Sequence, residues 1–145
     1  MEAKIIQFIE QHHVLTLATV CNNQPYCCTV FYAFCEQEQR FVFSSDEATA
    51  HIRHIAKNPQ AAASIVLETK MVGKIQGIQL QGIVYPALGE LLPSAEHAYW
   101  QRFPYARLMN TTLWIFEPHW AKLTDNRLGF GKKLLWTRDA ATHTL

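Results

Sequence analysis

Residues 41–59 read FVFSSDEATAHIRHIAKNP and combine a strand with a helix. The first half of this stretch is an apolar strand that ends at Ser44 and Ser45. Its second half is a helix that stops at Asn58 and Pro59, because a residue that precedes proline is disfavoured in the helical conformation. A helix N-terminus offers free backbone N–H groups and the positive end of the helix dipole, which together favour an anion. The stretch therefore predicts a strand-to-helix corner suited to a small anion.

The side chains at this corner are of the kinds that bind phosphate. Ser44, Ser45 and Thr49 supply hydroxyl groups, while His51 and Arg53 supply a titratable ring and a fixed cation. A charge-assisted hydrogen bond to a phosphate contributes on the order of 1.5 to 3 kcal/mol. The same residues also fit a helix cap that is followed by a solvated cationic face. The pattern alone leaves both interpretations open.

The composition excludes several classes of function. The chain of 145 residues carries a formal net charge of +1, which gives no general attraction to nucleic acid or to anionic lipid. No apolar run approaches the ~20 residues that cross a bilayer. The acidic start MEAKIIQFIEQHH is unlike a signal peptide. We therefore expect one domain over residues 1–145, located in the cytoplasm, with no nucleic-acid or membrane partner.

The four cysteines are Cys21, Cys27, Cys28 and Cys35, and their spacing contains no C-x-x-C pair. We interpret them as reduced, mostly buried structural thiols. A redox or metal-binding role is the alternative. However, Cys27 and Cys28 would point to opposite faces of a strand, so both could not serve one site.

Short runs of alternating or β-branched residues predict about seven strands. They cover residues 14–20, 26–34, 40–44, 61–68, 76–84, 111–124 with an interruption at Pro118, and 132–138. Helices are expected over residues 3–11, between Thr49 and Asn58, and over residues 93–102. The links are of hairpin length and no β-α-β alternation is present. The prediction is a mainly β fold, a small antiparallel β-barrel with two to three short peripheral helices.

Other chemistries have weaker support from the residues. The sequence holds no G-x-S-x-G and no Walker motif, and Gly129-Phe130-Gly131 lacks the third glycine of a dinucleotide fingerprint. His51 and His54 could bind a transition metal, but histidines three apart without a nearby carboxylate are more often surface residues. No metal site is predicted, and no catalytic residue can be assigned. The four tryptophans could line a ring-binding pocket but are expected in the core or an interface.

Over nearly its whole length the chain resembles the FMN-binding split-barrel proteins related to pyridoxamine 5'-phosphate oxidase, and most closely the YhbP-type bacterial subgroup. The resemblance runs through HVLTLATV, QPYCCTVFYAF, RFVFSSDEATAHIRHIAKNPQAA, GIQLQG and AYWQRFP, and it ends at LTDNRLGFGKKLLWTRD. The last segment is the feature most specific to the subgroup. The resemblance implies a split β-barrel, a homodimer, and FMN bound at the subunit interface.

The resemblance also implies which residues would bind the cofactor. Ser44 and Ser45 at the strand end and Thr49 at the helix start would hold the phosphate. The backbone of a neighbouring strand would run beside the flavin ring, and the residues concerned are Cys28, Thr29, Val30 and Phe31. A dianionic phosphate requires donors and a dipole, whereas a flat ring requires a polar backbone edge and apolar cover.

The chain departs from the oxidase at three places. Ala50 and His51 stand where the oxidase has an Arg-Lys pair that grips the phosphate, so we expect affinity to weaken above pH ~6.5. Lys132 or Lys133 of a partner subunit is a candidate for the missing cation.

The substrate-binding Arg-x-His of the oxidase aligns with Arg127 and Gly129, so only the arginine is retained. Gly77 replaces a flavin-contacting glutamine.

Three hypotheses follow from the sequence. The first is a homodimeric FMN-binding flavoprotein, an oxidoreductase that acts on an unknown small molecule other than pyridoxamine phosphate. The second is a barrel that binds haem without enzymatic activity, with a histidine or Cys28 near the iron. The third is a cofactor-free dimeric barrel that serves as an interaction module.

Overall fold

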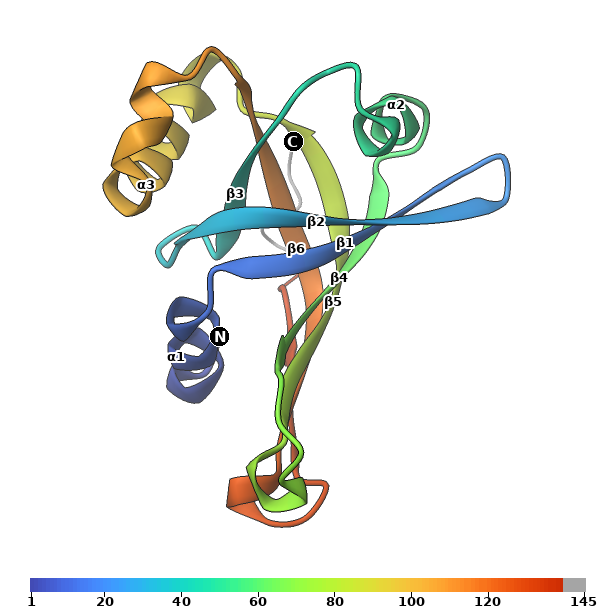
Figure 1. The fold of residues 1–145 in the computed structure, drawn as a ribbon, viewed down its shortest axis with the longest axis vertical. Coiled ribbons are helices and arrows are strands. Elements are labelled where there is room, and N and C mark those ends of the chain that lie inside the picture. The colour runs from blue at the N-terminus through green and yellow to red at the C-terminus, as the bar shows by residue number, and fades with distance from the viewer. Residues whose placement is uncertain (140–145) are drawn as a thin grey trace.

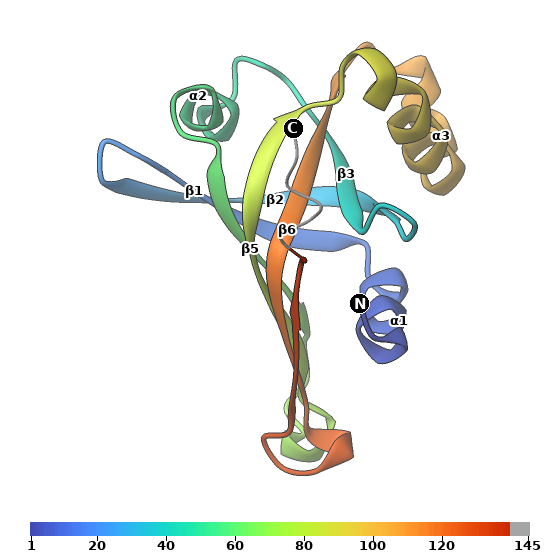
Figure 2. The same ribbon diagram turned by 180° about the vertical axis from the view of Figure 1, so that it is seen from behind.

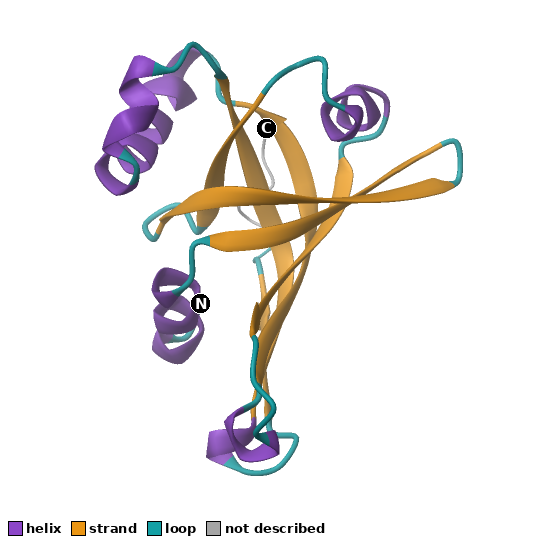
Figure 3. Cartoon of the chain, viewed as in Figure 1, coloured by secondary structure: helices purple, strands orange, loops and turns teal. Residues whose placement is uncertain are grey.

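The predicted strands form one antiparallel sheet in a computed structural model that describes residues 1–139 (Figure 3). The strands are β1 Val14–Cys21, β2 Gln24–Cys35, β3 Arg40–Ser45, β4 Gln60–Leu67, β5 Gln76–Pro86, β6 Thr112–Asp125 and β7 Lys133–Thr137. The helices are α1 Ala3–Gln11, α2 Ala50–Lys57 and α3 Leu92–Arg102, with short 3-10 helices η1 Val72–Lys74, η2 Gly89–Leu91, η3 Pro104–Leu108 and η4 Asn126–Leu128. The predicted mainly β class and the positions of its elements are confirmed.

The sheet closes on itself to make a barrel. The strand order is β3-β2-β1-β4-β5-β6-β7, and β3 also pairs with β6, so that Ser45 lies opposite Thr112. The inward side chains fill the barrel, and Phe41, Phe43 and Phe116 are fully buried there. Closure pairs the outer edge of β3, which an open sheet would leave exposed.

The helices lie around this barrel, as Figures 1 and 2 show from opposite sides. Ile52 and Ile55 of α2 belong to the barrel core, which anchors that helix. Tyr99 of α3 packs in a second apolar cluster that also contains Val42 and Ile115. The corner that precedes α2 is therefore fixed from two sides, by the sheet and by its own helix.

The predicted interruption at Pro118 is a change of register inside one continuous strand. Gln81 of β5 pairs with Trp120, and the next residue, Gly82, pairs with Pro118, so His119 is an extra residue. Proline has no N–H to donate to the ladder, and such residues are tolerated at bulges. A Cβ added at Gly82 would lie 2.1 Å from the carbonyl oxygen of Glu117, so the close approach here requires glycine.

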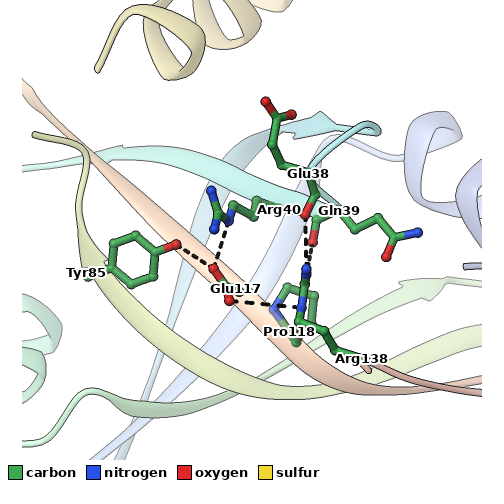
Figure 4. Close-up of polar contacts among 7 residues, drawn as sticks. All are labelled: Glu38, Gln39, Arg40, Tyr85, Glu117, Pro118 and Arg138. Atoms are coloured by element: carbon green, nitrogen blue, oxygen red, sulfur yellow. Dashed lines mark hydrogen bonds and ion pairs between the residues drawn. The ribbon is translucent and has the colours of Figure 1, made fainter. Parts of the chain in front are cut away.

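Glu117 is the centre of an ion network that links strands β3, β5 and β6 with the chain after β7 (Figure 4). Its Oε2 accepts hydrogen bonds from Arg40 Nε at 2.7 Å and from the Tyr85 hydroxyl at 2.6 Å. Arg138 Nε lies 4.0 Å from Oε1 of Glu117. Arg138 also donates to the carbonyl oxygens of Pro118, Glu38 and Gln39, which fastens this end of the chain to the β2–β3 turn.

The ends of β5, β6 and β7 extend away from the barrel as a finger that carries η1 and η4 at its tip (Figure 1). The tip lies at the opposite end of the molecule from α2. Lys132 lies in the tip, beside the turn that leads into β7.

Candidate functional site

The end of β3 and the start of α2 bring three polar side chains together. The Oγ of Ser45 lies 2.6 Å from Nε2 of His51 and 3.4 Å from Oγ1 of Thr49. Thr49 Oγ1 in turn lies 3.3 Å from the same ring nitrogen. We call Ser44, Ser45, Thr49 and His51 the β3–α2 corner. Three of the residues predicted for the phosphate, Ser45, Thr49 and His51, therefore have side chains in contact, whereas the Ser44 hydroxyl bonds to Thr111 and Arg53 is exposed.

The backbone of the corner supplies further donors. The first bond within α2 runs from the Arg53 N–H to the Thr49 carbonyl oxygen, at 3.0 Å. The amides of residues 50–52 consequently have no carbonyl one turn earlier in the helix. The carboxylate of exposed Asp46 accepts from the Ala48 N–H at 2.7 Å and holds the loop before the helix. The amides of the first turn remain as donors for an anion.

His51 is buried, and its ring contacts two hydroxyls of the corner. Its pKa is lowered from the ordinary imidazole value, first by burial and then by the neighbouring charge of His54. The ring is therefore neutral at pH 7 in this structure. A phosphate placed among Ser45, Thr49 and the amides would have to replace or protonate this ring.

Two residues of the neighbourhood come from the distant strand β6 and its approach. Trp114 Nε1 donates to the carbonyl oxygen of Ser45 at 3.0 Å, and the Ser44 hydroxyl donates to Oγ1 of Thr111. These contacts fix the end of β3. Sequence reasoning missed both, because they join residues 67 and 69 positions apart and leave no local pattern.

Strand β2 changes partner next to the corner. It pairs with β1 from Gln24 to Phe31 and with β3 only from Tyr32 to Cys35. Beyond the pair Tyr32–Phe43, β3 turns away to follow β6, as Figure 1 shows. Over residues 28–31 the edge of β2 that faces away from β1 is thus unpaired within the described sheet. Every second residue of this stretch directs a backbone N–H and C=O toward that edge.

The side chains of residues 28–31 alternate between the two faces of the sheet. Val30 is buried and Cys28 is half-buried against the core, while Thr29 and Phe31 are exposed. Burial, and secondarily the neighbouring Cys27, raises the pKa of the Cys28 thiol to about 11, so it stays protonated. All four cysteines are free, but only three are half-buried and Cys27 is exposed, so the prediction of mostly buried thiols is correct only in part.

The family to which the chain belongs follows from comparison with known proteins. Residues 1–124 match the family model described as pyridoxamine 5'-phosphate oxidase. The chain belongs to the pyridoxamine 5'-phosphate oxidase family. A UPF0306 protein of Yersinia pseudotuberculosis is 34% identical over 134 residues, which cover 92% of this chain and 91% of the relative. The resemblance to this family and subgroup is confirmed.

Solved structures show that members of this fold differ in what they bind. A haem-binding protein of Mycobacterium smegmatis matches with a TM-score of 0.72 and 20% identity, over 86% of this chain and 52% of that protein. An FAD-binding protein of Mesorhizobium loti matches with a TM-score of 0.68 and 13% identity, over 85% of this chain and 94% of that protein. These likenesses establish the split-barrel fold.

The remaining predicted residues lie away from the corner. Lys132 sits in the finger tip, so one chain cannot bring it to Ser45. Arg127, the retained arginine, donates from Nε and Nη2 to the two carboxylate oxygens of Asp125 and from Nη2 to Gln76 Oε1, all within 3.1 Å. Its guanidinium is therefore already paired with a carboxylate of its own chain.

The described residues also bear on metal binding and on membrane insertion. Residues 1–139 contain no group of three or more His, Cys, Asp or Glu side chains that could hold a metal ion. The helices of this region are all too short or too polar to cross a bilayer.

Proposed function

We propose that the protein binds FMN, with the phosphate in the β3–α2 corner and the flavin ring along the free edge of β2. The observation that carries this proposal is the divergence of β2 and β3 after the pair Tyr32–Phe43. It places a polar backbone edge beside a helix N-terminus, and these two features suit the ring and the phosphate respectively.

The corner fits a phosphate through neutral donors more than through cations. Ser45 and Thr49 contribute hydroxyls, and the first turn of α2 contributes amides. Among residues 1–139, His51 is the one titratable side chain within hydrogen-bond distance of both hydroxyls. A dianion beside this ring would stabilise its protonated form, so FMN binding would take up a proton.

The edge of β2 fits a flat ring in the same way. Its backbone offers alternating donors and acceptors to the ring nitrogens and carbonyls. Phe31, whose side chain is 59% exposed, supplies apolar cover next to that edge. Cys28 would remain a neutral thiol there because burial raises its pKa.

A second copy of the chain would complete the site. Strands β1, β2 and β4 contain no charged residue, and their outer face presents exposed Thr29, Phe31 and Val66. Such an uncharged face is typical of a subunit interface. In a homodimer, the finger of one subunit would bring Lys132 to the corner of the other and supply the fixed cation that one chain lacks.

The proposed activity is that of an oxidoreductase acting on a small molecule. Bound flavin would supply electron or hydride transfer, while the chain binds and orients the cofactor and limits access of water. Oxidation of pyridoxamine phosphate is disfavoured. Arg127 is paired with Asp125, and Gly129 offers no side chain at the position of the oxidase histidine.

Haem is the second candidate ligand, because the Mycobacterium smegmatis neighbour is described as haem-binding. Iron would require an available ligand. His51 is already bonded to Ser45 and Thr49, and the Cys28 thiol is held protonated. Iron binding would therefore require His51 to give up these hydrogen bonds or Cys28 to lose its proton.

An absorption spectrum of the freshly purified protein, with its mass in solution, tests the proposal. We expect the protein to have the mass of a dimer and to show flavin absorption bands, either as purified or after addition of FMN. The intensity of these bands should correspond to nearly one FMN per subunit. A Soret band after haem addition that is lost in His51→Ala would instead support haem. If the protein binds neither FMN nor haem at pH 6 or pH 8, the remaining hypothesis is a cofactor-free barrel that serves as an interaction module.

A further inference from the structure

A cavity lies between α3, η3 and the start of β6. It has a volume of about 220 Å³. Most of its lining is apolar, including Leu88, Leu92, Trp100, Ala106, Met109 and Leu113. A closed apolar cavity of ~150 Å³ is large enough to hold benzene. The size and lining of this cavity therefore suit a single aromatic ring with a short substituent.

The cavity and the β3–α2 corner share a wall. Thr111 lines the cavity, and its hydroxyl accepts the hydrogen bond from Ser44. Thr112 also lines it and pairs with Ser45 in the β3–β6 ladder. A molecule in the cavity would thus be separated from a group bound at the corner only by the paired end of β3 and start of β6.

The mouth of the cavity carries apolar side chains that are unusually exposed. Leu88 is 61% exposed and Met109 is 63% exposed, although both also line the cavity. Burial of such side chains by a bound molecule contributes roughly 25 cal/mol per Å² of apolar surface removed from water. Leu88 and Met109 are therefore suited to cover an apolar ligand at the mouth of the cavity.

The charge of the cavity selects the ligand further. Glu96 is the only charged residue among its lining residues, and it is half-buried. Arg107 does not line the cavity, although its guanidinium lies 5.4 Å from the centre of the Trp100 ring, which does. An anionic ligand would face the Glu96 carboxylate, whereas an ammonium group would be attracted to it.

We propose that this cavity binds a single-ring aromatic molecule without negative charge, and an aromatic amine in preference to a neutral ring. The role of this cavity as the substrate site rests on the proposed flavin function. The binding of an aromatic ring in the cavity does not depend on that function. Phosphorylated and carboxylated ring compounds are excluded by the same carboxylate that favours the amine.

Three probes that share one ring test the charge preference: benzylamine, benzyl alcohol and benzoate. Ligand-detected NMR on the full chain without added flavin is expected to show millimolar binding of benzylamine, weaker binding of benzyl alcohol, and none of benzoate. In Glu96→Gln the affinity for benzylamine should fall about three- to fivefold, to that of benzyl alcohol. Equal binding of benzoate and benzylamine would overturn the proposal.

Two alanines make a matched pair for the location. Ala106 lines the cavity, whereas Ala98 on α3 lines a different cavity. Ala106→Phe should abolish binding of both neutral and cationic probes, while Ala98→Phe should leave it unchanged. Binding that survives Ala106→Phe, or no binding of any probe to the unmodified chain, would contradict the proposal.

The outcome is separable from that of the flavin proposal. Ring binding without FMN binding would retain the cavity and remove its role in flavin chemistry. FMN binding without ring binding would do the reverse. If Ala106→Phe fails to fold, the response of Glu96→Gln still decides the question, because that change alters one half-buried carboxylate and no packing volume.

Discussion

The Oγ of Ser45 and Nε2 of His51 are 2.6 Å apart, so a strand-end hydroxyl and a helical histidine already satisfy each other at the proposed phosphate site. A phosphate that used Ser45 would compete with this contact. Protonation of His51 would end the competition, because both ring nitrogens of an imidazolium donate and the phosphate accepts. Affinity at the corner is therefore tied to the protonation of His51.

FMN affinity should depend on pH through His51. Burial and His54 lower the pKa of the free ring, while a bound dianion would raise it, so binding takes up a proton. The dissociation constant should fall about fivefold between pH 8 and pH 6, since a charged hydrogen bond exceeds a neutral one by roughly 1 kcal/mol. Fluorescence titration measures it. His51→Gln should remove the dependence, and riboflavin should show none; an unchanged slope in the variant would refute the assignment.

Replacement of Gly82 by alanine should destabilise the barrel. The new Cβ would lie 2.1 Å from the backbone oxygen of Glu117, which cannot move without breaking the bulge. We expect a loss of about 3 kcal/mol in the free energy of unfolding, measured in urea. Gly73→Ala is the control, because nothing lies within 4 Å of its added Cβ, and it should change stability by less than about 1 kcal/mol. Equal effects would argue against the register shift.

Glu117→Gln should weaken the attachment of the chain after β7. The carboxylate is buried, and its loss would leave Arg40 and Arg138 without their counter-ion. The expected cost is about 3 kcal/mol of unfolding free energy, against little change for exposed Glu68→Gln.

The same carboxylate gives a pH signature. Burial tends to raise the pKa of Glu117, but the hydrogen bond from Tyr85 and the charge of Arg40 outweigh it, so the pKa is lowered. Its contribution is therefore present at neutral pH and is lost as the pH falls below the ordinary carboxyl range. The stability difference between the unmodified chain and Glu117→Gln should shrink in acid, and a constant difference would contradict this.

Lys132→Ala should weaken FMN binding without affecting stability. The lysine lies in the finger tip, where it is exposed, so its only expected role is at the corner of a second subunit. We expect a five- to tenfold loss of FMN affinity at low salt, on the scale of one charge-assisted bond. Lys70→Ala, which removes another exposed lysine, is the matched control. Equal losses in the two variants would remove Lys132 from the site.

Local patterns made most of the fold predictable. The strand run VLTLATV and the helix that stops before Pro59 are specified by residues adjacent in the chain. Closure of the barrel through Ser45 and Thr112 joins residues far apart in sequence, and the partner change of β2 at Tyr32 depends on that closure. These features carry no local signal.

The candidate site was predictable to a similar extent. The hydroxyls of Ser45 and Thr49 were placed together because they flank one short loop. The contact from Trp114 and the pairing of Arg127 with Asp125 required the tertiary structure. The separation of Lys132 from the corner also depends on the tertiary structure, because the finger tip and α2 lie at opposite ends of the molecule.

The most direct test of the account compares FMN with riboflavin, which has the same ring and no phosphate. In the Ser45→Ala/Thr49→Ala double variant, the FMN dissociation constant should rise on the order of a hundredfold while that of riboflavin stays unchanged, because each of the two lost bonds to the phosphate is worth roughly 1.5 kcal/mol. Thr137→Ala, an exposed hydroxyl on β7, should alter neither. If the unmodified chain binds riboflavin as tightly as FMN, or the double variant weakens both equally, the phosphate does not bind at this corner.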